Sequence, residues 1–179
     1  IAVLILAVLS PILGALADYS GMKKKLFVLF LMLGLAGLFS LSVTTEWKAF
    51  LLLFVVARVG YSACNVFYDS MLTDVTTDEK MDMVSSHGFA WGYIGSCVPF
   101  ILGIVLIFTK PFGMSTMLAT QLSFLITGIW WMLLTIPLLR NVKQTYCLEN
   151  RKGKVLDAFR RLGQTFKKIR TRKDLLFYI

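Results

Sequence analysis

The sequence predicts an all-α, polytopic membrane protein. Of its 179 residues, 57% are hydrophobic and 16% are charged, whereas soluble domains are about 45–50% apolar and about 25% charged. The apolar residues gather in five long stretches that carry almost no charge. None of these stretches alternates strictly between apolar and polar residues, as a transmembrane β-strand would. Together these observations indicate helices in lipid rather than a water-soluble core.

The five stretches give the expected membrane spans. Each is close to the ~20 residues with which a helix crosses ~30 Å of hydrocarbon. A helix also satisfies its own backbone hydrogen bonds, which lipid does not. We therefore expect a transmembrane bundle over residues 1–139, with spans at 1–17, 26–44, 49–68, 88–108 and 114–139.

The basic residues predict how this bundle is oriented. When the loops are assigned alternately to two sides, one side carries 16 Lys and Arg residues, at 23–25, 80 and 140–174. The other side carries two, Lys48 and Lys110. The positive-inside rule places the first side in the cytoplasm. The chain then begins at the outer face. If the full protein has a cytoplasmic N-terminus, we expect one further helix before the first residue of this chain.

The segment 140–174 carries 12 basic and 3 acidic residues. Within it, apolar residues recur on one helical face, at Val155, Phe159, Leu162, Phe166 and Ile169. This pattern is typical of a basic amphipathic helix on the inner leaflet, with membrane lipid as its partner. Because membrane spans flank this segment, we do not expect nucleic acid to bind. Residues 175–179 are apolar enough to begin a further span.

The sequence contains no pattern typical of a catalytic or metal site. Its three cysteines, Cys64, Cys97 and Cys147, are far apart, and its one histidine, His87, has no ligand-spaced partner. No phosphate-binding Gly-x-x-x-x-Gly-Lys-Ser/Thr loop is present. We therefore predict neither an enzyme nor a bound metal or cofactor.

The stretch GALADYSGMKKK joins the first two expected spans. Lys23 and Lys24, with the lysine that follows them, suit a cytoplasmic loop anchor. We expect loss of Lys23 alone to matter less than loss of Asp18, because two lysines remain. Asp18 stands at the carboxyl end of a helix, where the helix dipole disfavours negative charge. We therefore expect Asp18 to face a cation or the N-terminus of another helix, although it could simply end the helix.

The same stretch resembles the loop between the second and third helices of major facilitator superfamily transporters. The matching positions are Gly14, Asp18, Gly21, Lys23 and Lys24, whereas Tyr19 stands where many members carry Arg. The resemblance implies that this loop is a gating loop, in which Asp18 helps to latch the two halves of a transporter on the cytoplasmic side. It also makes the five spans helices two to six of that fold, a six-helix bundle lacking its first helix.

A polar stripe crosses the third expected span. Arg58, Asn65 and Asp69 lie within roughly 20° of one line at about 100° per residue, and Tyr61 flanks that line. A charged side chain in mid-membrane costs about 2.5–3.5 kcal/mol even on the mildest scale. The stripe is therefore expected to face protein or water, as part of a substrate or proton pathway. Arg58 either serves an anionic group of the substrate or pairs with an acid on a neighbouring helix.

Small residues gather on one face of the fourth expected span, at Gly88, Gly92, Gly95 and Ser96. Small residues at this spacing let helix backbones approach closely, which predicts helix packing here. The aromatic residues Trp91 and Tyr93 flank this face, and either could line a substrate cavity or pack against a neighbour.

The stretches VFYDSMLTDV (66–75) and VSSHGFAWGYIGS (84–96) resemble the vacuole-effluxer family of the superfamily, which is related to the yeast autophagy-associated amino-acid exporter. The matching positions are Phe67, Tyr68, Ser70, Leu72, Ser85, Ser86, Gly88, Phe89, Ala90, Gly92, Tyr93 and Gly95. Asp69 and Thr73 depart from the pattern, since Asn and Pro are common there. The resemblance implies the N-terminal half of a twelve-helix secondary transporter, partnered by its missing first helix and C-terminal bundle. It further implies export of a small organic solute such as amino acids, across the cell membrane or, in a eukaryote, the vacuolar membrane.

A second class of function is compatible with the same composition. A non-transporting membrane scaffold or sensor could use the basic amphipathic helix of 140–174 to bind a partner. Such a protein has no need of Arg58 in mid-membrane, so the polar stripe favours a transporter.

Overall fold

The computed structural model describes residues 2–147, and among these residues every regular element is helical. The four longest helices are α2 (Met22–Leu41), α3 (Trp47–Ser70), α5 (Met81–Thr109) and α6 (Thr116–Asn141). Shorter ones are α1 (Ala2–Ala17), α4 (Leu72–Val75), and the 3₁₀ turns η1 (Asp78–Lys80) and η2 (Pro111–Gly113). The predicted amphipathic helix of 140–174 and the apolar residues 175–179 lie, apart from residues 140–147, outside the described part.

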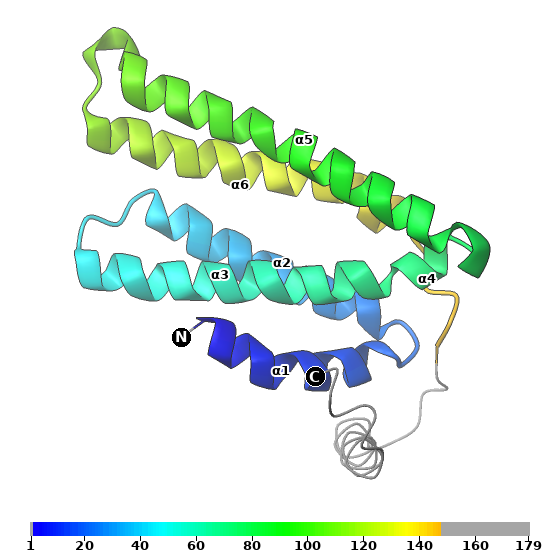
Figure 1. Ribbon diagram of the computed structural model, residues 1–179. Helices are drawn as coiled ribbons and strands as arrows, with labels where there is room; N and C mark the ends of the chain where they lie inside the picture. Colours follow the sequence, from blue (N-terminus) through cyan, green and yellow to red (C-terminus); the bar gives the residue numbers. More distant parts are fainter. Residues whose placement is uncertain (1, 148–179) are drawn as a thin grey trace, which may run out of the picture.

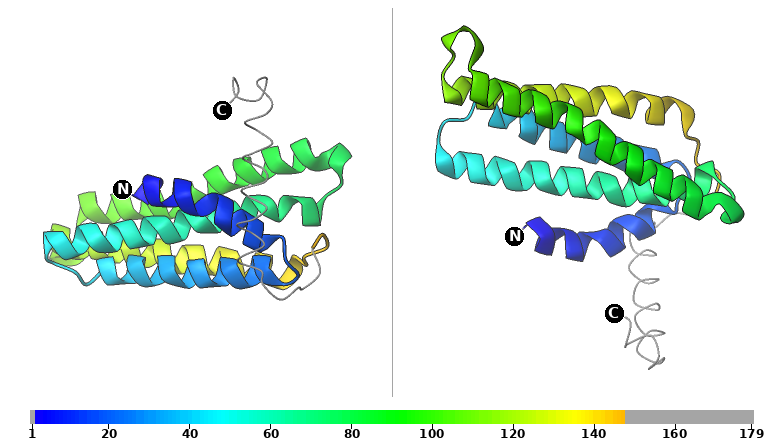
Figure 2. Two further views of the ribbon diagram at one scale, coloured as in Figure 1. Left: turned by 90° about the horizontal axis from the view of Figure 1, so that it is seen from below. Right: turned by 45° about the horizontal axis from the view of Figure 1, so that its top comes forward.

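The four longest helices and α1 lie side by side, and the chain reverses direction from each of these five helices to the next (Figure 1; Figure 2). The connections 42–46 and 110–115 lie at one end of the bundle, whereas 18–21, 71–80 and 142–147 lie at the other. We call the second end the lysine-rich end, because it also carries Lys23–Lys25 and Lys80. The loops thus alternate between two ends, as the sequence-based count of basic residues on each side assumes.

Four of the five predicted spans are long and apolar enough to cross a membrane. They are α2, α3, the continuous stretch Asp78–Thr109, and α6. The helix α1 is apolar throughout but has 16 residues, fewer than the ~20 that a perpendicular span needs. The prediction of an all-α, polytopic membrane protein is therefore confirmed, while the crossing by α1 stays a prediction.

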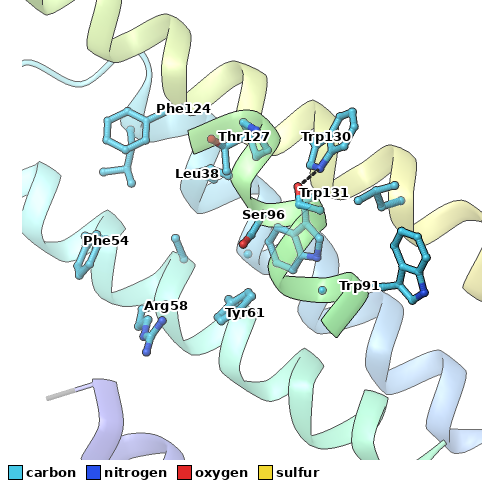
Figure 3. A pocket seen from close by; sticks show the side chains of 17 residues that line it. Leu38, Phe54, Arg58, Tyr61, Trp91, Ser96, Phe124, Thr127, Trp130 and Trp131 are labelled. Atoms are coloured by element: carbon cyan, nitrogen blue, oxygen red, sulfur yellow. Dashed lines mark hydrogen bonds between the residues drawn. The ribbon is translucent and has the colours of Figure 1, made fainter. Parts of the chain in front are cut away.

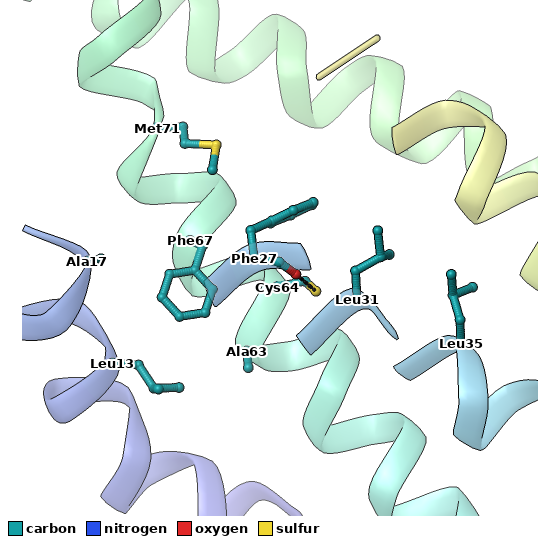
Figure 4. Packing of buried hydrophobic residues seen from close by; sticks show 9 residues of the cluster. All are labelled: Leu13, Ala17, Phe27, Leu31, Leu35, Ala63, Cys64, Phe67 and Met71. Carbon is teal, nitrogen blue, oxygen red and sulfur yellow. Dashed lines mark hydrogen bonds between the residues drawn. The ribbon is translucent and has the colours of Figure 1, made fainter. Parts of the chain in front are cut away.

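The buried core lies where α1, α2 and α3 meet, near the lysine-rich end (Figure 4). On α3, Ala63 and Phe67 are fully buried, and Val59, Gly60 and Cys64 share their face. The residues of this cluster are Leu13, Ala17, Phe27, Leu31, Leu35, Ala63, Cys64, Phe67 and Met71. One face of α3 thus packs against α1 and α2, whereas its opposite face takes no part in this core.

The backbones of α2 and α3 approach closely at two glycines, Gly34 and Gly60. A Cβ atom added at Gly60 would lie 2.5 Å from the backbone nitrogen of Gly34 and 2.9 Å from the carbonyl oxygen of Phe30. Glycine is needed here because a side chain would overlap backbone atoms, which move less readily than the end of a side chain. Small residues at a crossing point are the usual device by which membrane helices pack closely.

Candidate functional site

A cavity of about 500 Å³ opens between α2, α3, α5 and α6 (Figure 3). Its wall is mostly apolar and aromatic, with Arg58 as its charged residue. The side chains labelled in Figure 3 are Leu38, Phe54, Arg58, Tyr61, Trp91, Ser96, Phe124, Thr127, Trp130 and Trp131. Apolar pockets of ~300–1,000 Å³ with a few placed polar groups are typical of small-molecule sites.

Aromatic contacts fix the side chains around Arg58. Its guanidinium carbon lies 5.6 Å from the centre of the Tyr61 ring, within the ≈ 6 Å range of a cation–π contact. The Tyr61 ring in turn meets Trp131 edge to face, with 5.7 Å between ring centres. Trp130 donates a hydrogen bond from Nε1 to the carbonyl oxygen of Gly95, at 3.0 Å (Figure 3). The wall of the cavity is therefore held by specific contacts rather than by packing alone.

A second cavity, of about 670 Å³, continues along α3 and α5 toward the lysine-rich end. Asn65, Asp69 and Tyr93 line it. The two cavities share Tyr61, Gly92 and Ser96 as wall residues, so they adjoin one another. All six residues predicted from sequence for the substrate cavity therefore lie on one cavity or the other: Arg58, Tyr61, Asn65, Asp69, Trp91 and Tyr93.

The polar stripe lies on the exposed face of α3, opposite the core. Arg58, Asn65 and Asp69 are exposed, whereas Ala63 and Phe67 between them are fully buried. The alternative role for Arg58, pairing with an acid on a neighbouring helix, would require an ion pair. Within residues 2–147, the ion pair that forms is between Lys23 and Asp74, and Arg58 has none.

The small residues predicted for helix packing lie along the two cavities instead of at a backbone contact. A Cβ atom added at Gly92 would meet nothing within 4 Å, and one at Gly95 would lie 3.8 Å from the Leu134 side chain. Gly88 would bring a Cβ atom to 3.3 Å from the Tyr68 hydroxyl, and Ser96 lines both cavities. Within the described residues, the close backbone contact lies at Gly34 and Gly60, so the helix-packing role of these four residues stays a prediction.

The lysine-rich end contains a buried ion pair that the sequence analysis did not predict. Lys23 Nζ lies 2.7 Å from Asp74 Oδ2 and donates a second hydrogen bond to the Ser70 carbonyl oxygen, at 3.0 Å. The Lys23 side chain is 6% exposed and that of Asp74 is 0% exposed. Lys23 thus has a buried acidic partner, which the expectation that Lys24 and Lys25 could stand in for Lys23 did not include.

Asp74 also holds the segment that follows α6. Its Oδ1 atom accepts hydrogen bonds from the backbone N–H groups of Thr145, at 2.8 Å, and Tyr146, at 3.0 Å. Burial acts to raise the pKa of Asp74, but the hydrogen bonds from Lys23, Tyr146 and Thr145 and the charge of Lys23 outweigh it and lower the pKa below its ordinary value. The carboxylate is therefore ionised at neutral pH.

Two more side chains tie the helix ends together at the lysine-rich end. Lys24 Nζ donates to the carbonyl oxygen of Leu139 near the end of α6, at 2.9 Å. Gln144 Nε2 donates to the carbonyl oxygens of Ala17, at 3.1 Å, and Tyr19, at 3.2 Å, after the end of α1. Since helix carboxyl ends leave carbonyl groups without intrahelical partners, these donors satisfy the carbonyl groups of Leu139 and Ala17, whereas that of Tyr19 also accepts the Met22 N–H.

The other residues of the predicted gating loop differ in backbone conformation and in burial. Gly21 has φ of 68° at the start of α2, a left-handed conformation that favours glycine, whereas a Cβ atom at Gly14 would meet nothing within 4 Å. Asp18 is exposed and forms no ion pair within residues 2–147. Tyr19, at the position where many family members carry Arg, is 2% exposed. The loop therefore buries a tyrosine and presents the acid to its surroundings.

Sequence reasoning missed four residues that build these sites: Asp74, Gln144, Trp130 and Trp131. Asp74 and Gln144 contact partners 51 and 127 positions away in the chain, and no periodic pattern encodes such pairs. Trp130 and Trp131 stand in an apolar stretch where an aromatic side chain suits core or lipid equally well.

Within residues 2–147, no three His, Cys, Asp or Glu side chains are grouped so that they could hold a metal ion.

Comparison with known proteins assigns the family. Residues 1–81 and 72–179 match the family described as "Vacuole effluxer Atg22 like". A relative from Bacillus subtilis (strain 168), described as "Uncharacterized MFS-type transporter YxiO", is 43% identical over 184 residues, which cover 100% of this chain and 43% of the relative. A relative from Aquifex aeolicus (strain VF5), described as "Uncharacterized protein", is 34% identical over 95 residues, which cover 52% of this chain and 24% of the relative.

The chain spans less than half the length of the curated relatives it matches. No solved structure matches it. The family match nevertheless extends from residue 1 to residue 179, and it agrees with the loop signature, the apolar helices and the polar stripe of α3. The chain therefore belongs to the Atg22-like vacuole effluxer family of the major facilitator superfamily.

Proposed function

We propose that this chain forms part of a secondary transporter in which the two adjoining cavities are part of the solute path. Such transporters expose a central site alternately to each side by rocking one helix bundle against another. The printed name of the relative from Bacillus subtilis supports a transporter. The observation that carries the proposal is the division of α3 into a packed face and a polar face that borders both cavities.

The physical argument rests on the cost of polar groups in lipid. Arg58, Asn65 and Asp69 are exposed on the bundle of residues 2–147. If their face met lipid, Arg58 alone would cost about 2.5–3.5 kcal/mol on the mildest scale. A face that borders water or a polar solute avoids this cost. A polar path therefore accounts for the polar stripe of α3. Packing does not account for it, because the opposite face of α3 makes the buried contacts.

The family resemblance directs the choice of solute and direction. It favours export of a small organic solute, with amino acids as the first class to assay. We expect the cell membrane as the location in a bacterium and the vacuolar membrane in a eukaryote. Membrane lipid, a helix preceding α1 and a second helix bundle are the expected partners, and the second bundle would complete the cavity wall.

The experiment that tests the proposal uses the full-length protein that carries this chain, reconstituted in proteoliposomes. Release of labelled amino acids and organic acids is compared between the wild type, Arg58→Gln and Lys48→Gln. Lys48 is an exposed cation at the other end of α3, 5.7 Å from the Trp47 ring and outside both cavities. We expect Arg58→Gln to lower transport at least tenfold and Lys48→Gln to retain it.

Thermal stability in detergent separates the two roles of Arg58. Removing an unpaired cation from the solute path leaves stability unchanged or raises it, whereas breaking a buried pair costs roughly 3–5 kcal/mol. Transport by Arg58→Gln at the wild-type rate would show that Arg58 is not needed in the solute path. Absence of transport for every solute by a well-folded wild type would instead favour the scaffold or sensor.

A further inference from the structure

The helices α2 and α6 pack against each other behind α3 and α5 in the view of Figure 1. Near the end of α2, the Phe39 ring lies so close to α6 that a Cβ atom added at Gly128 would overlap it. At the lysine-rich end, Lys24 Nζ donates to the Leu139 carbonyl oxygen, at 2.9 Å. Because these contacts hold the two helices together, the sides that they turn away from the bundle form one surface.

This surface, which we call the α2–α6 face, is apolar over most of its length. Leu29 and Met32 are its exposed residues on α2, and Ile129, Leu133 and Ile136 are those on α6. Residues three and four positions apart are neighbours on a helix surface, so each set forms one stripe. In a chain with membrane-spanning helices, lipid acyl chains can cover such stripes at no hydrophobic cost.

An exposed cation ends each stripe at the lysine-rich end. Lys25 stands four residues before Leu29 on α2, and Arg140 stands four residues after Ile136 on α6. Each cation therefore lies on the same side of its helix as the apolar residues next to it. The α2–α6 face thus has the two parts of an amphiphile site, a positive end and an apolar track.

The hydrogen bond between Lys24 and Leu139 also brings the two cations together. Lys25 follows Lys24 in the chain, and Arg140 follows Leu139. Both cations have long side chains that can turn toward one group at the membrane surface. The Arg140 guanidinium can bind two oxygens of a phosphate at once, and the Lys25 ammonium can add a point charge.

Acidic residues at the lysine-rich end lie on other segments of the chain. Asp74, Asp78, Glu79 and Asp82 belong to the stretch between α3 and the first turn of α5, and Asp18 follows α1. The ends of α2 and α6 therefore supply the positive charge of this end. Positive charge at the membrane surface attracts anionic lipids.

The spacing along α6 suits a phospholipid in size. Leu133 lies seven residues before Arg140, which is about 10 Å along the helix axis. An acyl chain that extends from a phosphate at Arg140 would pass Ile136 and then Leu133. A free phosphate would use the cations and leave the apolar track without a function.

We propose that the α2–α6 face binds an anionic phospholipid as a specific partner of this chain. Lys25 and Arg140 hold the phosphate, and an acyl chain lies along the apolar stripes of α2 and α6. A zwitterionic phospholipid binds less tightly, because the ammonium group of its own head group offsets the attraction of its phosphate to the two cations. This site lies outside both cavities and does not depend on the proposed transport function.

The test detects lipid at the α2–α6 face itself. The full-length protein that carries this chain, with Cys64, Cys97 and Cys147 replaced, receives Leu133→Cys and a bimane label at that position. It is reconstituted in phosphatidylcholine vesicles that contain brominated phosphatidylglycerol or brominated phosphatidylcholine with the same acyl chains. Bromine quenches bimane at short range, so quenching reports the lipid beside Leu133 and not lipid bound elsewhere on the protein.

We expect half-maximal quenching at a mole fraction of brominated phosphatidylglycerol about fivefold lower than that of brominated phosphatidylcholine. Lys25→Gln combined with Arg140→Gln should remove this difference. The matched control, Lys48→Gln combined with Lys80→Gln, also removes two exposed cations and should retain it. In detergent without phospholipid, both double variants should unfold at the wild-type temperature, because surface substitutions change stability little.

Should the double variant fail to fold, Lys25→Gln and Arg140→Gln are measured singly, and each should reduce the preference about twofold. Equal quenching by the two lipids in the wild type, or a preference that survives the loss of both cations, would overturn the proposal. Relief of quenching by soluble glycerol phosphate would also overturn it, since free phosphate would then be the ligand. A preference for phosphatidylglycerol in a protein that transports no solute would uphold the lipid site and refute the proposed function.

Discussion

The ammonium nitrogen of Lys23 lies 2.7 Å from Asp74 Oδ2, and both side chains are almost fully enclosed. The pair joins the first turn of α2 to α4, the short helix that follows α3. Asp74 uses its other oxygen to accept the N–H groups of Thr145 and Tyr146. One carboxylate therefore connects three segments that are distant in sequence, which makes it the most informative position for mutation at the lysine-rich end.

We expect Lys23→Gln or Asp74→Asn to destabilise the protein by roughly 3–5 kcal/mol, because each leaves a buried charge without its partner. The double variant should cost less than the sum of the two. Thermal unfolding in detergent measures the effect, with Lys25→Gln as the control, since Lys25 is an exposed lysine of the same turn. Equal stability of Lys23→Gln and Lys25→Gln would show that the pair contributes nothing.

The lowered pKa of Asp74 predicts how its contribution depends on pH. A carboxyl whose pKa is lower in the folded state contributes stability above its unfolded pKa, about 3.9, and loses it as the pH falls through the folded value. The stability difference between wild type and Asp74→Asn should thus be constant from about pH 8 to 5. It should shrink below about pH 4. A difference that already disappears between pH 7 and 6 would contradict this assignment.

Gly60→Ala should destabilise the bundle, since its Cβ atom would fall 2.5 Å from the Gly34 backbone nitrogen. Overpacking of this kind typically costs about 1–3 kcal/mol. Gly92→Ala is the matched control, because its Cβ atom would meet nothing within 4 Å. Melting temperatures in detergent compare the two variants. A Gly60→Ala protein as stable as Gly92→Ala would mean that α2 and α3 separate at little cost.

Asp18→Asn should impair transport by the full-length protein at unchanged expression and insertion, because we expect this exposed acid to contact the other half of the transporter. Asp78→Asn serves as the control, since Asp78 is an exposed acid at the same end of the bundle. The measurement is the initial rate in proteoliposomes. A normal transport rate for Asp18→Asn would show that Asp18 only ends the helix and is not needed for transport.

The orientation can be tested by thiol labelling in cells, after Cys64, Cys97 and Cys147 are replaced. A cysteine at position 112 should react with a membrane-impermeant reagent from outside, because Phe112 is fully exposed in η2, which lies at the end opposite the lysine-rich end. A cysteine at Glu79, exposed at the lysine-rich end, should be protected. The reverse labelling pattern would invert the predicted topology.

The sequence predicts features that depend on neighbours along one helix. The shared face of Arg58, Asn65 and Asp69 follows from helical periodicity alone, and the structure places that face on the cavities. Contacts between helices are different. The partners of Lys23 and Gln144 depend on how helix ends meet, and the approach of Gly60 to Gly34 depends on the crossing of α2 and α3. Neither the meeting of helix ends nor the crossing of two helices can be predicted from the spacing of residues along the chain.

The hydrogen bonds of Gln144 have a mechanical consequence. This side chain links the segment after α6 to the carbonyl groups that follow α1, while Asp74 links the same segment to α4. A tensile load applied to the chain beyond Tyr146 would therefore be shared by the ends of α1 and α4, and would not pull on α6 alone. These hydrogen bonds fasten the segment after α6 to the ends of α1 and α4, so that a pull on this segment would displace α1, α4 and α6 together.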